Sequence, residues 1–246
     1  MGELIAILSG KGGTGKTSVC AGIAEALALQ GERVLCIDCD VGLRNLDIAL
    51  CMSDSCSLSF ADLFGGEYTL AQATSHRDFP TLRFLTAPVN CRAEDVDREA
   101  FAALLKKARR TFSYIFLDAP AGIDAGFRLC ASFADRVILV TNSDPGSIRD
   151  AGHTADLLET MGKSETRVVV NRLNGKMFSA TSRTVDDLMD EVGLPLLGIV
   201  PEDMNIPLAA AFGTPLLCYA RKTPAAAACR RIAKRLTGYH VSLTIR

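Results

Sequence analysis

Short apolar runs alternate along this chain with longer segments in which apolar residues recur every three or four positions. The short runs are candidate strands, at residues 4–9, 33–38, 82–87, 114–118, 136–141, 167–171 and 196–200. The longer segments are candidate helices, at residues 16–30, 98–111, 147–161, 182–192 and 224–236. Several strand runs are apolar throughout, which is typical of strands buried on both faces of a parallel sheet. The pattern predicts an α/β fold: a doubly wound, mostly parallel sheet flanked by helices.

Residues with strong conformational preferences mark some ends of these elements. Thr223 is a predicted N-cap, and Pro224 suits the first position of the last helix. Gly31 suits the left-handed cap that ends the first helix. The chain has no repeat, low-complexity tract or linker, so we expect one domain over residues 1–246 with a short tail at 237–246. Alternating apolar residues in that tail predict an added strand or contact segment: Val241, Leu243 and Ile245.

The composition fits one large domain and excludes several classes of protein. The chain has 246 residues, of which 48% are hydrophobic and 22% charged, enough to bury a sizeable core. Its net charge of −1 gives no global field that would recruit nucleic acid or anionic lipid. No apolar run approaches the ~20 residues of a membrane-spanning helix, and no signal peptide is evident. Nine irregularly spaced cysteines favour a reducing cytoplasm over a disulfide framework.

One cysteine pair has the C-x-x-C spacing of many metal sites, formed by Cys36 and Cys39. Cys36 lies inside a predicted strand, where side chains three positions apart point to opposite faces of the sheet. No second C-x-x-C pair exists to complete a zinc site. We therefore interpret the cysteines as small core or surface residues.

The strongest chemical signal is a phosphate loop at residues 10–17, which read Gly-Lys-Gly-Gly-Thr-Gly-Lys-Thr. The loop follows a predicted strand and opens a predicted helix, so several backbone N–H groups point into one concavity at a helix N-terminus. In a G-x-x-x-x-G-K-[ST] loop the lysine, here Lys16, reaches the β- and γ-phosphates, and the hydroxyl, here Thr17, ligates Mg²⁺. The sequence predicts that this chain binds a nucleoside triphosphate.

Further polar residues follow other predicted strands, at the edge of the sheet that carries the phosphate loop. Asp38 and Asp40 leave the second strand, where either suits a Mg²⁺ ligand through water or the positioning of an attacking water. Asp118 ends an apolar run and resembles the acidic partner of Mg²⁺ in nucleotide sites. Gly122 allows a backbone N–H to approach the γ-phosphate, and Asn171 suits recognition of a base edge. Each acid also fits a turn or helix cap.

The phosphate loop carries a second lysine, Lys11, and so resembles the deviant Walker A motif of the MinD/ParA family of ATPases. Residues 42–47, 118–123 and 197–203 are similar to the MinD branch of that family, which serves bacterial division-site selection. The resemblance extends from about residue 3 to residue 236. It implies a P-loop ATPase that binds ATP and Mg²⁺ and forms a homodimer with two ATP molecules between the subunits.

The resemblance also implies roles for individual residues. It implies catalytic roles for three residues, of which the first crosses to the partner subunit and the last activates water: Lys11, Lys16 and Asp40. It implies that ATP is bound by Gly12, Gly13, Thr14, Gly15, Lys16, Thr17, Ser18, Gly122, Asn171 and Arg172, with the last two facing adenine. It implies that Mg²⁺ is held by Thr17, Asp38 and Asp118.

Partners follow from the same resemblance. It implies proteins of the division-inhibitor and activator type, in the cytoplasm or peripherally at the inner face of the cell membrane. Members of the MinD branch end in a basic amphipathic helix that grips the membrane, whereas here a helix at residues 223–236 is followed by ten residues. Its apolar face is small and alanine-rich, so we expect a helix docked on the sheet with its basic residues in solvent. Membrane contact is then at most weak.

Two other functions stay open on the sequence. A ParA-like partition ATPase or a flagellar-number regulator shares the same motifs, and nonspecific DNA binding by the former needs a basic patch. Basic residues cluster at Arg230, Arg231, Lys234 and Arg235 and at Lys106, Lys107, Arg109 and Arg110. A third function on this fold, that of an iron–sulfur reductase, is disfavoured by the sequence. Such a reductase needs two cysteines per subunit, and Cys91 and Cys130 lack the expected glycine-rich surroundings.

Overall fold

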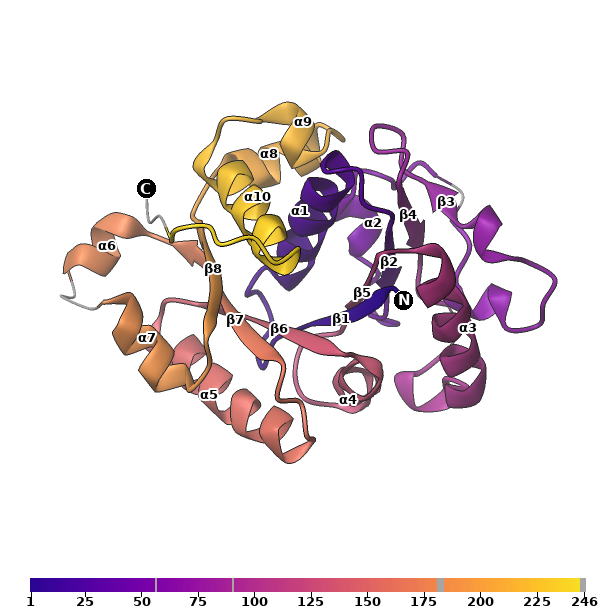
Figure 1. Ribbon diagram of the computed structural model, residues 1–246, viewed down its shortest axis with the longest axis horizontal. Helices are drawn as coiled ribbons and strands as arrows, with labels where there is room; N and C mark the ends of the chain where they lie inside the picture. The colour runs from indigo at the N-terminus through magenta and orange to yellow at the C-terminus, as the bar shows by residue number, and fades with distance from the viewer. Residues whose placement is uncertain (56, 90, 181–183, 244–246) are drawn as a thin grey trace.

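The computed structural model describes residues 1–55, 57–89, 91–180 and 184–243. One twisted sheet of eight strands forms its centre, in the order β3-β4-β2-β5-β1-β6-β7-β8, with helices on both faces (Figure 1). All neighbouring pairs are parallel except β3 with β4. The predicted doubly wound, mostly parallel α/β fold is confirmed.

Seven strands match the seven apolar runs, and the short antiparallel edge strand β3 was not predicted. The strands are β1 (Glu3–Leu8), β2 (Val34–Asp38), β3 (Thr74–Ser75), β4 (Leu82–Leu85), β5 (Tyr114–Asp118), β6 (Arg136–Asn142), β7 (Thr166–Leu173) and β8 (Leu196–Pro201). In β1 both faces are buried: Leu4, Ala6 and Leu8 pack on one side and Ile5 and Ile7 on the other. Continuous apolar character in the sequence therefore reflects two cores, one on each face of the sheet.

Two groups of helices cover these two faces. One face carries α1 (Lys16–Leu29), α2 (Leu46–Ala49), α8 (Asn205–Ala211), α9 (Leu216–Tyr219) and α10 (Pro224–Leu236). The other carries α3 (Arg98–Thr111), α4 (Ala125–Phe133), α5 (Pro145–Thr160), α6 (Gly175–Ala180) and α7 (Val185–Val192). Short 3₁₀ turns lie at Phe60–Leu63, Leu70–Gln72 and Ala93–Asp95. No helix among the described residues is both long and apolar enough to cross a bilayer.

The last helix is docked, as expected. Its residues Ala225, Cys229 and Ile232 are buried against α1 and β8. Two glycines allow this close approach: a Cβ at Gly22 would lie 2.6 Å from Cys229 Sγ, and a Cβ at Gly198 would overlap Ile232. Thr223 caps the helix by accepting from the Ala226 N–H at 3.4 Å, as predicted.

Several predicted boundaries were wrong. The predicted helix at 147–161 begins earlier, at Pro145, because Asp144 accepts from the Ser147 N–H and caps it. The predicted helix at 182–192 begins at Val185 with Thr184 as its cap; residues 182 and 183 lie outside the described residues. The predicted added strand is absent from the described part of the tail, residues 237–243. There Arg235 instead donates to the Val241 carbonyl oxygen.

The buried cysteines confirm the interpretation of the C-x-x-C pair. Cys36 packs in one core and Cys39 in the other, on opposite faces of the sheet. Cys130 is a fully buried residue of α4, and a cysteine without solvent access is unsuitable for a cluster shared between subunits. Cys56 lies outside the described residues. No cluster of three or more metal-ligating side chains occurs among the residues that the structure describes.

Candidate nucleotide-binding site

The phosphate loop joins β1, at the middle of the sheet, to the N-terminus of α1. Gly13 and Gly15 have φ angles of 79° and 81°, in the left-handed region that favours glycine. Gly15 faces the Asn171 amide so closely that a Cβ would overlap Asn171 Nδ2. That amide donates to the Thr14 carbonyl oxygen at 2.8 Å. The turn therefore depends on glycine both for its backbone conformation and for its contact with β7.

A second amide supports the same carbonyl. Asn142, at the end of β6, donates to the Thr14 oxygen at 3.1 Å when its amide is oriented to satisfy both of its atoms. The Asn171 Oδ1 and Thr14 Oγ1 atoms are buried and have no hydrogen-bond partner in the described structure. Sequence reasoning missed Asn142, because an asparagine at a strand end is equally common as a turn residue.

Lys16 opens α1 and extends into the space beneath the loop. Its side chain is 9% exposed, and Nζ lies 3.7 Å from Asp118 Oδ1, whose side chain is 2% exposed. Asp118 Oδ1 accepts no hydrogen bond in the described structure. Burial raises the pKa of Asp118, although Lys16 and the Thr17 hydroxyl act to lower it. A buried carboxylate with an unused lone pair is therefore aimed at the helix N-terminus.

Asp38 lies beside Asp118 because the two residues are paired in register on the neighbouring strands β2 and β5. Its Oδ1 accepts from the Asp40 N–H at 2.9 Å and its Oδ2 from the Leu46 N–H at 3.1 Å. Burial, and then the charge of Asp118, raise the pKa of Asp38 to about 7. Two adjacent buried carboxylates disfavour each other's ionisation, so a cation placed between them would stabilise both.

Asp40 lies in the turn after β2, more exposed than Asp38. Its Oδ1 accepts from the N–H groups of Gly42 and Leu43, each at 3.2 Å. These two bonds fix the carboxylate in the turn and leave Oδ2 without a hydrogen-bond partner among the described residues. The same turn holds Arg44 at a φ of 52° with its Nε donating to Thr86 Oγ1 at 3.1 Å.

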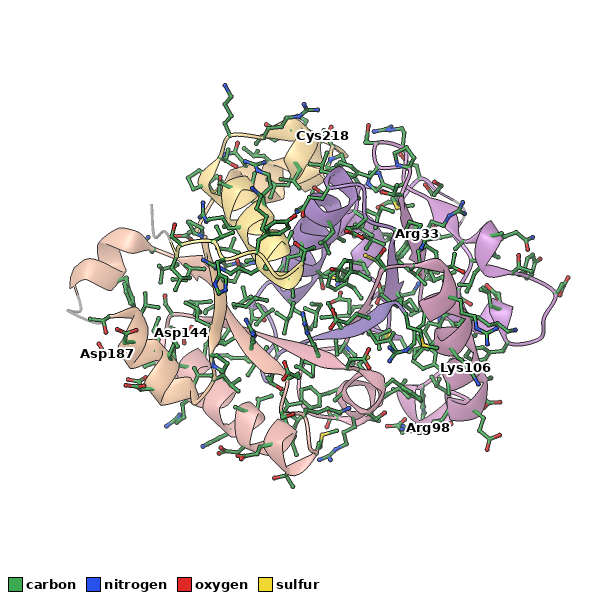
Figure 2. All side chains as sticks on the ribbon, in the orientation of Figure 1. Arg33, Arg98, Lys106, Asp144, Asp187 and Cys218 are labelled. Atoms are coloured by element: carbon green, nitrogen blue, oxygen red, sulfur yellow. The ribbon has the colours of Figure 1, made fainter. Side chains whose placement is uncertain are left out.

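Lys11 is exposed on the outside of the loop, on the side of the N-terminus of α5. A Cβ at Gly146 would lie 3.9 Å from Lys11 Nζ and 3.3 Å from Asp144 Oδ1. The Lys11 ammonium and the Asp144 carboxylate therefore both lie close to Gly146. Hydrogen bonds from Ser147 and the charge of Lys11 lower the pKa of Asp144. Asp144, labelled in Figure 2, was not predicted from the sequence, because a cap before Pro145 explains it equally well.

The remaining predicted site residues surround the loop. Thr17 and Ser18 follow Lys16 in the first turn of α1. Gly122 has a φ of 93°, and its N–H donates to the Ser9 carbonyl oxygen at 3.2 Å. Arg172 is exposed near the end of β7, with a φ of 52°. Gly12 lies at the surface of the loop, where a Cβ would lie 3.8 Å from the Cβ of Ala121.

The arrangement is that of an anion site joined to a cation site. The Lys16 ammonium lies 3.7 Å from Asp118 at the N-terminus of α1. Asp118 contacts the Thr17 hydroxyl and lies beside Asp38 on the neighbouring strand. A polyphosphate fits the loop and its lysine, and a hard divalent cation fits the hydroxyl and the two carboxylates, because such oxygens are its preferred ligands. The residues present therefore fit a magnesium nucleotide.

Comparison with known proteins agrees with this geometry. The model of the CobQ/CobB/MinD/ParA nucleotide-binding domain matches residues 5–216. The chain belongs to this family. Within the CobQ/CobB/MinD/ParA family its similarity is to the MinD branch, as the sequence motifs predict.

Individual members of the family cover almost the whole chain. The septum site-determining protein MinD of Synechocystis is 34% identical over 98% of this chain and 91% of its own length. MinD in the MinC:MinD cell division complex of Aquifex aeolicus superposes with a TM-score of 0.90 at 34% identity, over 98% of both chains. MinD of Pyrococcus horikoshii, solved with Mg-ADP, superposes with a TM-score of 0.83 at 26% identity, over 97% of both chains.

Proposed function

We propose that this protein is a MinD-type ATPase that acts in division-site selection as a dimerisation switch. In this proposal it binds ATP with Mg²⁺ as a homodimer, hydrolyses ATP slowly and then separates. The observation that carries the proposal is the buried Lys16 ammonium, 3.7 Å from Asp118 beneath a glycine loop at a helix N-terminus. Similarity to MinD proteins over nearly the full chain supports the choice of branch.

Each residue has a defined task in the proposed reaction. Lys16 and the loop N–H groups bind the β- and γ-phosphates. Thr17, Asp38 and Asp118 hold Mg²⁺, directly or through water. When bound, Mg²⁺ neutralises phosphate charge and aligns the phosphoryl group for transfer. Asp40, fixed by its turn and closer to solvent, orients the attacking water.

Recognition of the base and of the γ-phosphate uses the strand ends on either side. We assign adenine to Asn171 and Arg172. The unpartnered Asn171 Oδ1 supports this, because it is an acceptor suited to an exocyclic amino group. Gly122 is assigned to the γ-phosphate, which requires its N–H to exchange the Ser9 carbonyl oxygen for a phosphate oxygen.

Association is coupled to the nucleotide through Lys11. A lysine that extends to the partner's phosphates adds a positive charge only while the γ-phosphate is present, so loss of that phosphate weakens the dimer. In the monomer, Lys11 lies beside Asp144 at the N-terminus of α5. Dimerisation therefore requires Lys11 to leave Asp144 for the partner's nucleotide.

Partners of the division-inhibitor and activator type belong to the same proposal. The solved Aquifex aeolicus relative is a MinC:MinD complex, which supports a partner of the inhibitor type. Membrane contact is proposed as a weak, avidity-driven property of the dimer. A ParA-like DNA-binding role is disfavoured because part of each basic cluster is already engaged: Arg109 pairs with Asp135, and Arg235 donates to the Leu197 and Val241 carbonyl oxygens.

The deciding experiment measures molar mass by light scattering with Mg²⁺ and either a non-hydrolysable ATP analogue or ADP. We expect a dimer with the analogue and a monomer with ADP. Parallel calorimetry establishes that both nucleotides bind. Equal molar masses with both nucleotides bound would refute the switch and leave a nucleotide-binding domain without one.

A further inference from the structure

The opposite edge of the sheet, at the amino ends of the strands, carries a second recess. It encloses about 850 Å³ between the start of β1, the start of β5 and the end of α3. A recess of this size lies within the ~300–1,000 Å³ range of small-molecule sites. Because the phosphate loop lies at the carboxyl end of β1, this recess, here called the arginine cleft, is separate from the nucleotide site.

Backbone hydrogen bonds hold the walls of the arginine cleft in place. The Arg33 carbonyl oxygen accepts from the N–H groups of Ser113 and Tyr114, at 2.8 and 3.2 Å. The Arg109 carbonyl oxygen accepts from the Gly2 N–H at 2.8 Å. Three segments far apart in the sequence are thereby joined, which brings the side chains of Arg33 and Arg110 to the same recess.

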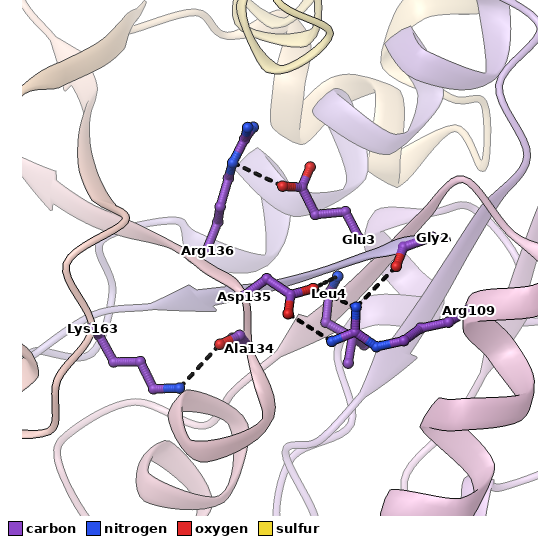
Figure 3. A network of polar contacts seen from close by, with 8 residues as sticks. All are labelled: Gly2, Glu3, Leu4, Arg109, Ala134, Asp135, Arg136 and Lys163. Carbon is purple, nitrogen blue, oxygen red and sulfur yellow. Dashed lines mark hydrogen bonds and ion pairs between the residues drawn. The ribbon is translucent and has the colours of Figure 1, made fainter.

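An ion-pair network forms the floor of the cleft (Figure 3). Arg109 donates to both oxygens of Asp135, at 2.6 and 2.7 Å, and to the Gly2 carbonyl oxygen at 3.0 Å. Asp135 also accepts from the Leu4 N–H at 2.9 Å. Glu3 pairs with Arg136 at 2.8 Å. Burial opposes ionisation of Asp135, but hydrogen bonds from Arg109 and Leu4 lower its pKa.

The charges that line the arginine cleft do not balance. Its two acids, Glu3 and Asp135, are neutralised by Arg136 and Arg109. Arg33 and Arg110 are exposed and have no ion-pair partner among the residues that the structure describes. Figure 2 labels Arg33, on the side of the molecule where the N-terminus lies. Two arginines without an ion-pair partner among the described residues therefore line a recess whose two acids are already paired.

We infer that the arginine cleft is a second anion site, specific for a phosphate monoester group. A guanidinium fork matches the oxygens of phosphate in a bidentate manner, and two forks from different segments would share one dianion. Ser113 and Tyr114 also line the recess, and a hydroxyl is a side-chain donor that suits a phosphate oxygen. Binding would place a dianion beside two arginines that have no ion-pair partner among the described residues, which favours charge-assisted hydrogen bonds.

The test is a titration with inorganic phosphate, observed through the arginine Nε–Hε resonances in NMR spectra. Excess Mg-ADP keeps the phosphate loop filled, and chloride at equal ionic strength controls for screening. We expect saturable shifts at Arg33 and Arg110. The double variant Arg33→Gln/Arg110→Gln should lose at least about tenfold in affinity. The matched control is Arg128→Gln, an exposed arginine on α4 outside the cleft, which should bind phosphate as the wild type does.

A second arm of the experiment distinguishes the source of the phosphate. Vesicles of phosphatidylcholine with phosphatidic acid present the same monoester at a surface. Binding of vesicles without binding of free phosphate, lost in the double variant, would assign the cleft to a lipid headgroup. The inference is overturned if neither probe shifts the two resonances, if chloride shifts them equally, or if Arg128→Gln weakens binding as much as the double variant.

Discussion

At the scale of single residues, the sequence predicted that the two buried acids of the site lie together, but not the side chains that support the phosphate loop. Asp38 and Asp118 could be placed together because both end apolar strands that a parallel sheet aligns at one edge. The support that Asn171 and Asn142 give to the Thr14 carbonyl oxygen could not be predicted. It depends on how far β6 and β7 extend past β1, and strand register is not encoded in a local pattern.

The close contact between Gly15 and Asn171 in the phosphate loop can be tested by substitution. Gly15→Ala should cost about 1–2 kcal/mol of stability for its left-handed φ and displace the Asn171 amide, so Mg-ADP binding should fall tenfold or more. Urea unfolding and calorimetry measure the two effects. Gly31→Ala is the matched control, because Gly31 has a φ of 86° and open space around it. If both variants bind Mg-ADP like the wild type, the contact between Gly15 and Asn171 is not required.

The buried carboxyl group of Glu25 predicts how the stability of the fold depends on pH. It is buried in α1, its Oε2 accepts from the Leu217 N–H at 3.1 Å, and burial raises its pKa to about 8. The folded state therefore holds a proton that the unfolded state releases near pH 4.5. The contribution of Glu25 to the free energy of unfolding is therefore fully present below pH 4.5 and is lost as the pH rises through 8. Glu25→Gln keeps the acceptor without the charge.

At pH 8 we expect Glu25→Gln to have a free energy of unfolding higher than that of the wild type by on the order of a few kcal/mol. It should therefore unfold at a higher temperature. The difference should shrink towards zero near pH 5. Thermal unfolding followed by circular dichroism across this range measures it. Glu159→Gln, exposed on α5, should follow the wild type at every pH. A constant offset between Glu25→Gln and the wild type would show that Glu25 is not titrating.

At the scale of elements, periodicity predicted what is long and regular. Seven strands and the helices α1, α3, α5 and α10 follow directly from apolar spacing. The pattern missed β3, which has two residues, and α4, where Pro120 and Gly122 just before the helix resemble a continuing loop. Short elements such as α8 and α9 are stabilised by tertiary packing, of α9 on α1 and of α8 on α9, rather than by an amphipathic pattern of their own.

The docking of α10 is tested through its central apolar residue. Ile232 is 1% exposed between α1 and β8, so Ile232→Ala should lose about 2–4 kcal/mol of unfolding free energy. Lys234→Ala, two residues on and exposed, should change it by no more than about 0.5 kcal/mol. Chemical denaturation measures both. Equal stability of the two variants would mean that α10 is not docked in solution.

At the scale of the whole molecule, the proposed switch predicts distinct effects for two residues near the nucleotide. Lys11→Ala should bind ATP as a monomer and fail to dimerise, because the charge that crosses the interface is gone. Asp40→Ala should form a dimer that persists, because the water is no longer oriented. Light scattering and phosphate release distinguish the two variants.

The matched control for Lys11 is Lys106→Ala, an exposed lysine on α3 that Figure 2 labels. It should dimerise and hydrolyse ATP as the wild type does. A Lys11→Ala protein that still dimerises would contradict the role of Lys11 across the interface. Wild-type turnover by Asp40→Ala would remove Asp40 from the mechanism.

The position of β1 has one more consequence. It lies between β5 and β6 near the middle of the sheet, and its residues from Leu4 to Leu8 are buried on both faces. Amides in such a strand exchange with deuterium only when the whole domain opens, whereas edge strands such as β3 exchange through local fraying. The phosphate loop, residues 10–17, is thus attached to the strand expected to exchange most slowly. On heating, the edge strands should therefore unfold locally first, and nucleotide binding should be lost last.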